Sequence, residues 1–229
     1  MPSGGNVHPF GTGAWRGPGS NTNTFAMESH MDVMAAAAGM DPVEFRLKNL
    51  TDQRMIRVVN AAAEKFGWKP AKTPSGRGYG MACLDYLGTY IAAMAEVKVD
   101  PASRRIRVER VVVAQDMGPV INPRGAQMQI EGCVTMGLGY VLSEEIRFNG
   151  GEIQDRNFGS YEIPKFSWLP RIETVLVENH DLAPQGCGEP AITCMGGVIA
   201  NALHDAIGVR VKQLPLTPER IRQASSPGS

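Results

Sequence analysis

The spacing of apolar residues predicts three helices in the first seventy residues of the chain. Apolar side chains recur every three or four positions from residue 24 onward, and Gly39 provides a stop, so we expect an amphipathic helix over 24–39 with its apolar stripe in the core. Asp41 followed by Pro42 is a typical helix start and predicts a short helix to about residue 49. A third helix is expected over 52–66. The apolar stripe of the first helix consists of Met27, Met31, Met34 and Ala38.

After about residue 80 the pattern changes to alternation, which indicates strands. Residues 93–99 and 105–114 alternate on either side of a turn at Asp100 and predict a β-hairpin. Strands interrupted by single helices are typical of an α+β fold with mixed sheets and packed helices. The segment 69–80 resembles a linker and divides the chain into 1–70 and 71–229. Further elements are expected as a helix over 122–142, a hairpin over 146–153, a strand over 172–177, a helix over 190–207 and a turn capped at 217.

The first 23 residues contain many glycines and prolines, which forbid long regular structure and predict a loop. Trp15 and Arg16 lie in the middle of this loop, and both side chains favour a surface to pack against. We therefore expect the loop to lie against folded structure, and the chain to begin in the middle of a larger fold.

Charge and composition exclude several classes of function. The 229 residues include 23 basic and 23 acidic side chains without a dense basic stripe, so we expect no nucleic-acid partner. No apolar run reaches the roughly 18 residues of a membrane-spanning helix, and the N-terminus lacks the order of a signal peptide. We expect a cytoplasmic protein without a membrane span, and leave open its export together with a partner.

The cysteines and histidines show no metal-binding spacing. No two cysteines form a Cys-x-x-Cys pair, so we expect neither an iron–sulfur cluster nor a structural zinc in this chain. The histidines lie apart from one another and from acidic clusters, and we assign no metal ligand among them. The residues concerned are Cys83, Cys133, Cys187, Cys194, His8, His30, His180 and His204.

Glu189 is the strongest candidate for a chemical role. Gly186 and Gly188 allow the chain before it to turn sharply and to approach a bound group closely. Pro190 suits the first position of the helix that follows, so the carboxylate is expected at a junction between loop and helix. The alternative is a solvent-facing residue that caps a helix, and a Gly-Glu-Pro tripeptide alone favours that alternative.

Several short motifs, each weak alone, occur in a defined order along nearly the whole chain. They are Ala14 to Gly19, Glu28 to Asp32, Gly39 to Leu50, Gln129 to Gly132, Met136 to Gly139, Asn157-Phe158, Tyr161 to Pro164, Gly188 to Pro190, Ala200 to Ala202 and Leu214 to Arg220. Together they resemble the molybdenum hydroxylase family of xanthine dehydrogenase and aldehyde oxidase. The resemblance is to the C-terminal part of the molybdopterin-binding subunit, of the bacterial type found in nicotinate and isoquinoline dehydrogenases.

The resemblance implies that the chain is part of a catalytic subunit. Residues 1–70 would complete the first molybdenum-binding subdomain, and residues 71–229 would form an α+β second subdomain. The family hydroxylates an N-heteroaromatic ring with oxygen from water, or oxidises an aldehyde, and uses a general base beside the metal. The position that matches this base is Glu189, and a carboxylate suits that role.

The resemblance also assigns other positions to the pocket. Arg16, Gly17 and Pro18 match the loop that shapes its substrate side, and Met136 replaces a glutamine of many relatives. Purine-oxidising members have an aromatic residue in place of Pro18, so this proline disfavours xanthine. The alternative for the glycines near the pterin is close packing of neighbouring elements. The positions expected to contact molybdopterin, either simple or as its cytosine dinucleotide, are Gln129, Gly132, Gly137 and Gly188.

Electron-transfer groups are expected on other chains, because the cysteine spacing excludes iron–sulfur clusters here. The resemblance implies a ferredoxin-like 2Fe–2S subunit, an FAD subunit or a cytochrome, and a larger molybdopterin subunit or a missing upstream half. The substrate would be a small molecule. Two alternatives remain open, namely a non-catalytic fragment or scaffold subunit of such a complex, and an independent small-molecule binding domain.

Overall fold

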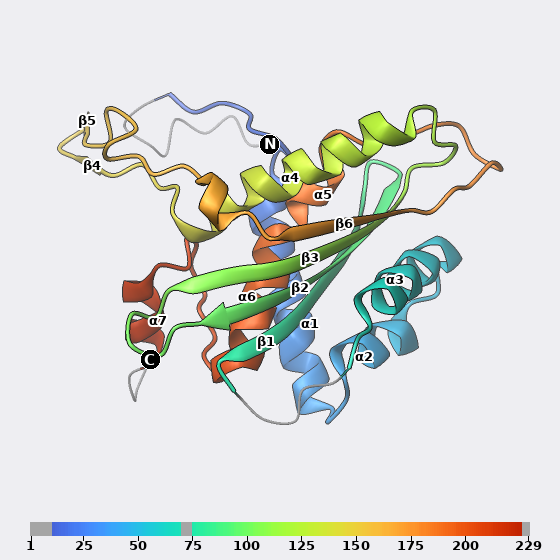
Figure 1. Cartoon of the computed structure of the whole chain (residues 1–229), viewed down its shortest axis with the longest axis horizontal. Coiled ribbons are helices and arrows are strands. Elements are labelled where there is room, and N and C mark those ends of the chain that lie inside the picture. The colour runs from blue at the N-terminus through green and yellow to red at the C-terminus, as the bar shows by residue number, and fades with distance from the viewer. Residues whose placement is uncertain (1–10, 70–74, 226–229) are drawn as a thin grey trace.

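The protein is built around a mixed four-stranded sheet. The computed structural model describes residues 11–69 and 75–225. Within them, the sheet has the strand order β1-β2-β3-β6, in which β1, β2 and β3 pair antiparallel and β6 pairs parallel to β3 (Figure 1). The sheet and the helices around it confirm the expected α+β class. The four strands are β1 (Arg77–Tyr86), β2 (Thr89–Val99), β3 (Ile106–Asp116) and β6 (Arg171–Leu176).

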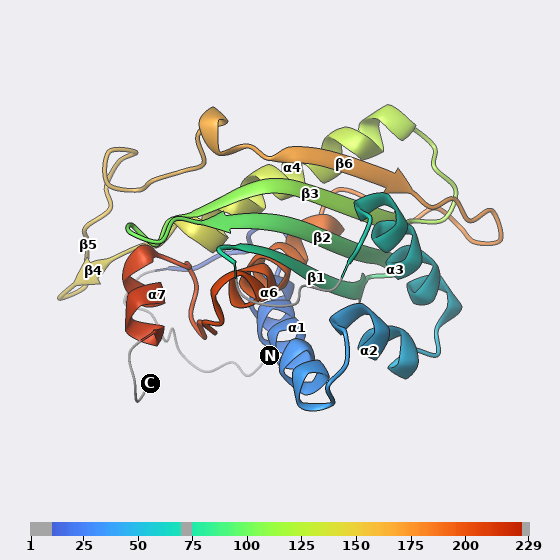
Figure 2. The same ribbon diagram turned by 60° about the horizontal axis from the view of Figure 1, so that its bottom comes forward.

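Helices cover both faces of this sheet, so that side chains from both faces are buried (Figures 1 and 2). The smaller core lies between the sheet and two helices, α2 (Pro42–Asn49) and α3 (Gln53–Phe66). The larger core lies on the opposite face, where α6 packs on β1 and β2 and α1 packs against α6. The helices of this second side are α1 (Ser20–Ala37), α4 (Pro123–Leu142), α5 (Pro190–Thr193), α6 (Met195–Ile207) and α7 (Pro218–Ala224).

Helix α6 lies directly against the edge strand β1 because this strand has glycine where the helix crosses it. A Cβ atom at Gly78 would overlap the carbonyl oxygen of Ala202, and one at Gly80 would overlap that of Val198. Any larger residue would push the helix away from the strand. The close contact fixes the start of α6, and the α5 turn before it, relative to β1.

Most of the expected elements are present, and their boundaries differ by a few residues. The predicted hairpin of 93–114 is confirmed as β2 and β3, and the helix over 122–142 as α4. The first helix begins at Ser20, four residues before the expected start. The helix expected over 190–207 is interrupted for one residue at Cys194, whose dihedral angles stay near helical values. Residues 1–10 of the predicted loop, including His8, lie outside the described residues.

Strand β1 was not expected from the sequence, because 69–80 resembles a linker. The strand begins at Arg77, and its first half contains Gly78 and Gly80, which are unfavourable in strands. Here the glycines are required by the contact with α6, so a tertiary constraint overrides the local preference. The division of the chain into 1–70 and 71–229 stays a prediction, and residues 70–74 lie outside the described part.

The expectation that the methionine stripe of α1 faces the core was wrong. Met27 is 52% exposed and Met34 is 38% exposed, whereas Glu28 and Asp32 are buried. The acidic side of the helix faces inward because Arg46 of α2 neutralises it, with Nη2 at 3.0 Å from Glu28 Oε2 and Nη1 at 2.7 Å from Asp32 Oδ1. Burial raises the pKa of both carboxyl groups, and the charge of Arg46 opposes that rise.

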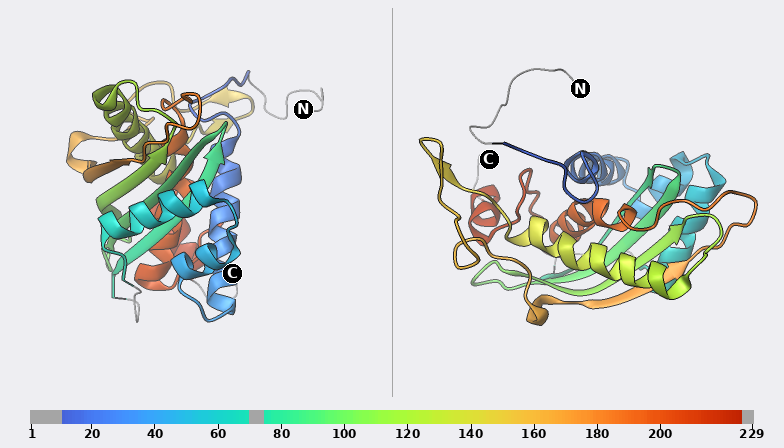
Figure 3. Two further views of the ribbon diagram at one scale, coloured as in Figure 1. Left: turned by 90° about the vertical axis from the view of Figure 1, so that its right-hand side faces the viewer. Right: turned by 90° about the horizontal axis from the view of Figure 1, so that it is seen from above.

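A segment between α4 and β6 extends away from the main sheet (Figures 1 and 3). It contains the predicted second hairpin, formed by β4 (Phe148–Asn149) and β5 (Glu152–Ile153), and a short 3₁₀ helix, η1 (Phe166–Trp168). None of the described helices is both long and apolar enough to cross a bilayer. The exposed large apolar side chains of this segment are Ile146, Phe148, Ile153, Phe158, Ile163, Phe166 and Leu169.

Candidate active site

Glu189 lies at the junction expected from the sequence. It is the residue directly before α5, Pro190 occupies the first position of that helix, and the Glu189 side chain is half-buried. Its Oε2 atom accepts a hydrogen bond of 3.0 Å from the hydroxyl of Tyr86, the last residue of β1. No hydrogen bond from the described residues reaches Oε1. One carboxylate oxygen is therefore held by the sheet, and the other is available to a bound molecule.

The turn between β1 and β2 holds the loop that carries Glu189. Thr89 is buried at the start of β2, where it pairs with Tyr86, and its Oγ1 donates a hydrogen bond of 2.8 Å to the carbonyl of Gly186. Burial raises the pKa of Tyr86, and the hydrogen bond to the Glu189 carboxylate raises it further. The phenol therefore keeps its proton and acts as the donor in this contact.

Arg16 holds the same loop from the other side. Its Nε atom donates a hydrogen bond of 2.7 Å to the carbonyl of Gly188, and Nη2 donates one of 2.7 Å to Oε1 of Gln129 on α4. Its Nη1 lies 3.3 Å from the sulfur of Met136, one further position on α4. The buried thiol of Cys133 also donates to the Gly188 carbonyl, at 3.3 Å. Three segments that are distant in the sequence therefore meet at Gly188.

The N-terminal loop is fixed in the place where Arg16 can make these contacts. The ring of Trp15 packs edge-on against Tyr140 of α4, with ring centroids 5.7 Å apart. Asn21 donates a hydrogen bond of 2.8 Å to the carbonyl of Arg16. Gly17 has a positive φ of 73°, and a Cβ atom there would lie 2.9 Å from Thr193 of α5, so glycine is required at this close approach. The expected packing surface for Trp15 and Arg16 is thus present.

The structure brings together most, though not all, of the residues predicted for the site. Arg16, Gln129, Gly132 and Gly188 form one cluster beside Glu189. Gly17 lies behind the loop against α5, and Pro18 is exposed next to it. Gly137 lies apart from the cluster, because it is buried and a Cβ atom there would overlap the side chain of Met195. Its geometry is that of a packing contact between α4 and α6.

Comparison with known proteins places the chain in a family. Residues 23–170 match the family described as the molybdopterin cofactor-binding domain. The chain belongs to this family of the molybdenum hydroxylases. Nicotinate dehydrogenase of Pseudomonas putida has a subunit that is 37% identical over 94% of this chain, and the beta subunit of isoquinoline 1-oxidoreductase of Brevundimonas diminuta is 34% identical over 89% of it. These matches cover 20% and 26% of the two relatives, so the chain spans about a quarter of their length or less.

The fold of this molybdopterin-binding chain is also found in solved structures. Quinoline 2-oxidoreductase from Pseudomonas putida 86 superimposes with a TM-score of 0.83 at 14% identity, over 93% of this chain and 53% of that one. Aldehyde oxidoreductase from Desulfovibrio gigas gives 0.76 at 18% identity, over 92% and 41%. At these identities the likeness shows a shared fold.

The cluster at Gly188 fits one wall of a molybdopterin site. The Arg16 guanidinium and the Gln129 amide are donors suited to ring and phosphate oxygens, and Nε2 of Gln129 makes no hydrogen bond with the described residues. A Cβ atom at Gly132 would lie only 3.3 Å from Arg16 Nη1, so glycine allows the guanidinium to lie close to α4. Gln129 is exposed and Arg16 is half-buried. The described residues therefore leave the cluster open on one side.

The residues that hold Glu189 in place were not among the predicted site residues. Tyr86 and Thr89 lie about a hundred residues before the loop that they contact, at the end of a strand that was itself not expected. Correct prediction of β1 and β2 as a hairpin would have placed both side chains at one turn. No local pattern indicates which loop this turn contacts. Cys133 was noted only for its spacing, whereas its thiol contacts the site.

Proposed function

We propose that this chain forms the wall of a molybdenum hydroxylase active site that carries the general base, with Glu189 as that base. The observation that carries the proposal is the carboxylate with one oxygen held by Tyr86 and the other without a hydrogen bond to the described residues, next to the open cluster of Arg16, Gln129 and Gly188. A carboxylate with a fixed orientation beside a cofactor wall is suited to removing one proton in a defined direction.

In this proposal each residue of the site has a separate role. Glu189 accepts the proton at Oε1, while the Tyr86 hydroxyl holds Oε2 and so sets the plane of the carboxylate. Arg16 fixes the backbone carbonyl of Gly188 and, with Gln129, would bind molybdopterin from the side of α4. When the cofactor is bound, it supplies oxygen transfer and the two-electron oxidation. Pro18, exposed beside Arg16, leaves space where an aromatic residue would restrict the substrate.

The substrate that we propose is an N-heteroaromatic compound of the nicotinate or isoquinoline type, with an aldehyde as the second candidate class. Relatives named for nicotinate and isoquinoline are 37% and 34% identical to this chain, and relatives named as aldehyde oxidoreductase subunits are about 25% identical. The higher identity favours the heteroaromatic class.

Further polypeptides are required by the proposal. The open side of the cluster and the exposed apolar residues of 146–169 are consistent with coverage by the rest of a molybdopterin subunit. Among the described residues, no group of three or more His, Cys, Asp or Glu could hold a metal ion. We therefore propose a ferredoxin-like 2Fe–2S subunit and an FAD subunit or a cytochrome as the route for electrons.

The proposal is tested by Glu189→Gln in the complex assembled with its partner polypeptides. Glutamine keeps the size and can still accept from Tyr86, yet it cannot take up the proton. We expect turnover of nicotinate to fall by about 10²–10⁴-fold while the molybdenum content stays constant. Glu178→Gln is the matched control, because Glu178 is exposed and its carboxylate contacts the equally exposed ring of His180. Full turnover by Glu189→Gln would remove this residue from the role of base.

A scaffold role without catalysis is the alternative function. It predicts that complexes containing this chain hold no molybdenum, and that the substitution at Glu189 leaves their assembly unchanged. Metal analysis of the wild-type complex distinguishes the two roles before any variant is made.

A further inference from the structure

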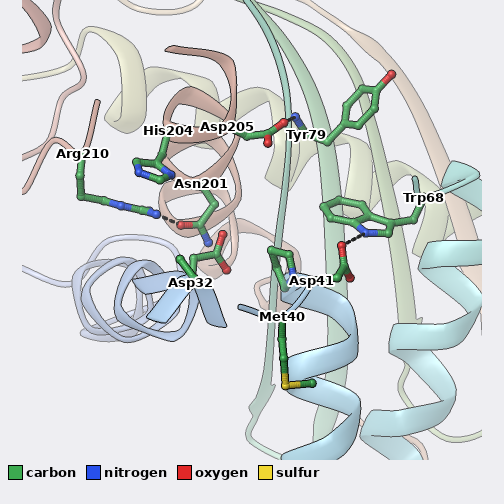
Figure 4. Close-up of a pocket in the computed structure, with 11 residues that line it drawn as sticks. Asp32, Met40, Asp41, Trp68, Tyr79, Asn201, His204, Asp205 and Arg210 are labelled. Carbon is green, nitrogen blue, oxygen red and sulfur yellow. Dashed lines mark hydrogen bonds between the residues drawn. The ribbon is translucent and has the colours of Figure 1, made fainter. Parts of the chain in front are cut away.

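A second polar cavity lies at the other end of strand β1, far from Glu189. Its volume is about 330 Å³, and it is lined by both ends of the α1–α2 connection, the start of β1 and the last turns of α6 (Figure 4). Tyr79, which lines this cavity, and Tyr86, which contacts Glu189, are seven residues apart on β1, which corresponds to about 23 Å. The residues that line it are Asp32, Ala36, Met40, Asp41, Pro42, Trp68, Tyr79, Asn201, His204, Asp205 and Arg210.

One side of this cavity is acidic. Oδ2 of Asp205 accepts a hydrogen bond of 2.7 Å from the backbone N–H of Tyr79, and Oδ1 of Asp32 accepts one from Arg46. Within the described residues, no hydrogen bond reaches the second oxygen of either carboxylate, and Asp205 has no ion pair. The last turns of α1 and α6 also end here, and the C-terminal end of a helix carries partial negative charge. The unpaired oxygen of Asp205 is suited to an ammonium group, whereas Asp32 lies beside Asn201 and Arg210 (Figure 4).

Arg210 also lines the cavity, on the side of Asn201 and Asp32 (Figure 4). Nη1 of Arg210 donates a hydrogen bond of 2.5 Å to Oδ1 of Asn201, whose side chain is itself buried (Figure 4). The Nε atom of Arg210 is buried and has no hydrogen-bond partner in the described structure. A buried donor without an acceptor costs free energy. Nη2 of Arg210 also makes no hydrogen bond with the described residues, and it is not buried, so it is the donor that a ligand can reach.

Burial shifts the pKa values of several charged groups around the cavity. Burial raises the pKa of Asp205, and the nearby carboxylate of Asp41 adds to the rise, although the hydrogen bond from Tyr79 opposes it. Burial lowers the pKa of Arg210, although the charge of Asp32 opposes this, and burial together with the charge of Arg210 lowers the pKa of His204. A ligand with one positive and one negative group would compensate both sides at the same time.

We propose that this cavity binds a small zwitterion, with its ammonium group against Asp205 and its carboxylate against Arg210. The volume is at the lower end of the range for ligand sites, which limits the ligand to a molecule of amino-acid size. Trp68 and Tyr79 supply aromatic surface on the side away from Arg210 (Figure 4). The site is separate from the proposed active site, so either proposal can fail without the other.

The test uses the purified full chain and isothermal titration calorimetry at pH 7 with linear ω-amino acids, from glycine to 6-aminohexanoate. At least one length is expected to bind saturably with one site per chain. The alkylamine and the carboxylic acid of the same length each lack one charge, and we expect them to bind at least tenfold more weakly. Because these probes are compared on the wild-type chain, the result does not depend on the folding of a variant.

Variants then locate the site. Asp205→Asn keeps an acceptor for the Tyr79 N–H, and Arg210→Gln keeps a donor for Asn201, so both should fold, as circular dichroism will check. Each is expected to weaken the best amino acid at least tenfold, whereas Asp181→Asn, at an exposed aspartate outside the cavity, leaves it unchanged. The proposal is overturned if no amino acid binds with a Kd below about 1 mM, which would leave water as the occupant. It is also overturned if the amine or the acid alone binds equally well.

Discussion

Replacement of Arg46 by methionine should strongly destabilise the fold. The Arg46 side chain is 1% exposed and binds Glu28, Asp32 and the backbone carbonyls of Glu28 and Pro42. Methionine fills much of the volume of the arginine stem and leaves two buried carboxyl groups without their counter-charge. Removal of one partner from a buried ion pair costs about 3–5 kcal/mol, so we expect a loss of that size in the free energy of unfolding, measured by urea denaturation.

Arg57→Met is the matched control for this experiment. Arg57 also pairs with a carboxylate, Asp116 at 3.2 Å, but its side chain is 50% exposed. Exposed pairs contribute about 0–1 kcal/mol because solvent screens them. If the two substitutions cost the same to within about 1 kcal/mol, the reasoning from burial is refuted.

The pH dependence of the Arg46→Met deficit provides a second check. Burial already raises the pKa values of Glu28 and Asp32 above their ordinary values of 4.5 and 3.8, so the folded state binds these protons more tightly than the unfolded chain. Without Arg46 the rise becomes larger. The deficit should therefore be greatest near pH 7, where folding must either bury the charges or take up protons, and should shrink as the pH falls through the folded pKa values. A deficit that is constant down to about pH 4 would contradict the assignment to these carboxyl groups.

Two further substitutions test the packing of β1 against α6 and the contact of Tyr86 with Glu189. Gly80→Ala should destabilise the fold by about 1–3 kcal/mol in urea denaturation, because its methyl group would overlap the backbone of α6, whereas Gly13→Ala, with open space around it, should have little effect. Tyr86→Phe in the assembled complex should reduce kcat about ten- to hundredfold at constant molybdenum content, because Glu189 loses its orientation. Tyr161→Phe, which also removes a hydroxyl bonded to a glutamate, is the control; equal rates for the two would exclude a positioning role.

The secondary structure was predictable where local patterns and tertiary requirements agree. Helices with clear caps, such as α2 after Asp41 and α4 after Asn122, appear where the sequence indicates them. Local pattern and tertiary requirement disagree in β1, where glycines that weaken a strand locally are needed for the contact with α6. They also disagree in α1, where the more apolar side faces outward because a single arginine, Arg46, makes the acidic side compatible with the interior.

The sequence predicted the main residues of the candidate site but not the contacts that hold them in place. Arg16, Gln129, Gly188 and Glu189 followed from the order of family motifs, and the structure places them side by side. The contact of Tyr86 with Glu189 joins residues separated by 103 positions, and no periodicity in the sequence encodes such a pair. Pairing of this kind depends on the strand register and on the path of a loop, which only the folded chain determines.

The loop that ends at Glu189 is anchored at two places, by the strand turn through Thr89 on one flank and by Arg16 on the other. A displacement of either anchor therefore moves the loop and, with it, the Glu189 side chain. Substitutions in the strand turn or in the N-terminal segment can therefore displace Glu189 without contacting it. A survey of variants by activity alone would identify such anchor residues together with residues that contact substrate. Structures of the inactive variants, rather than their rates alone, would separate the two groups.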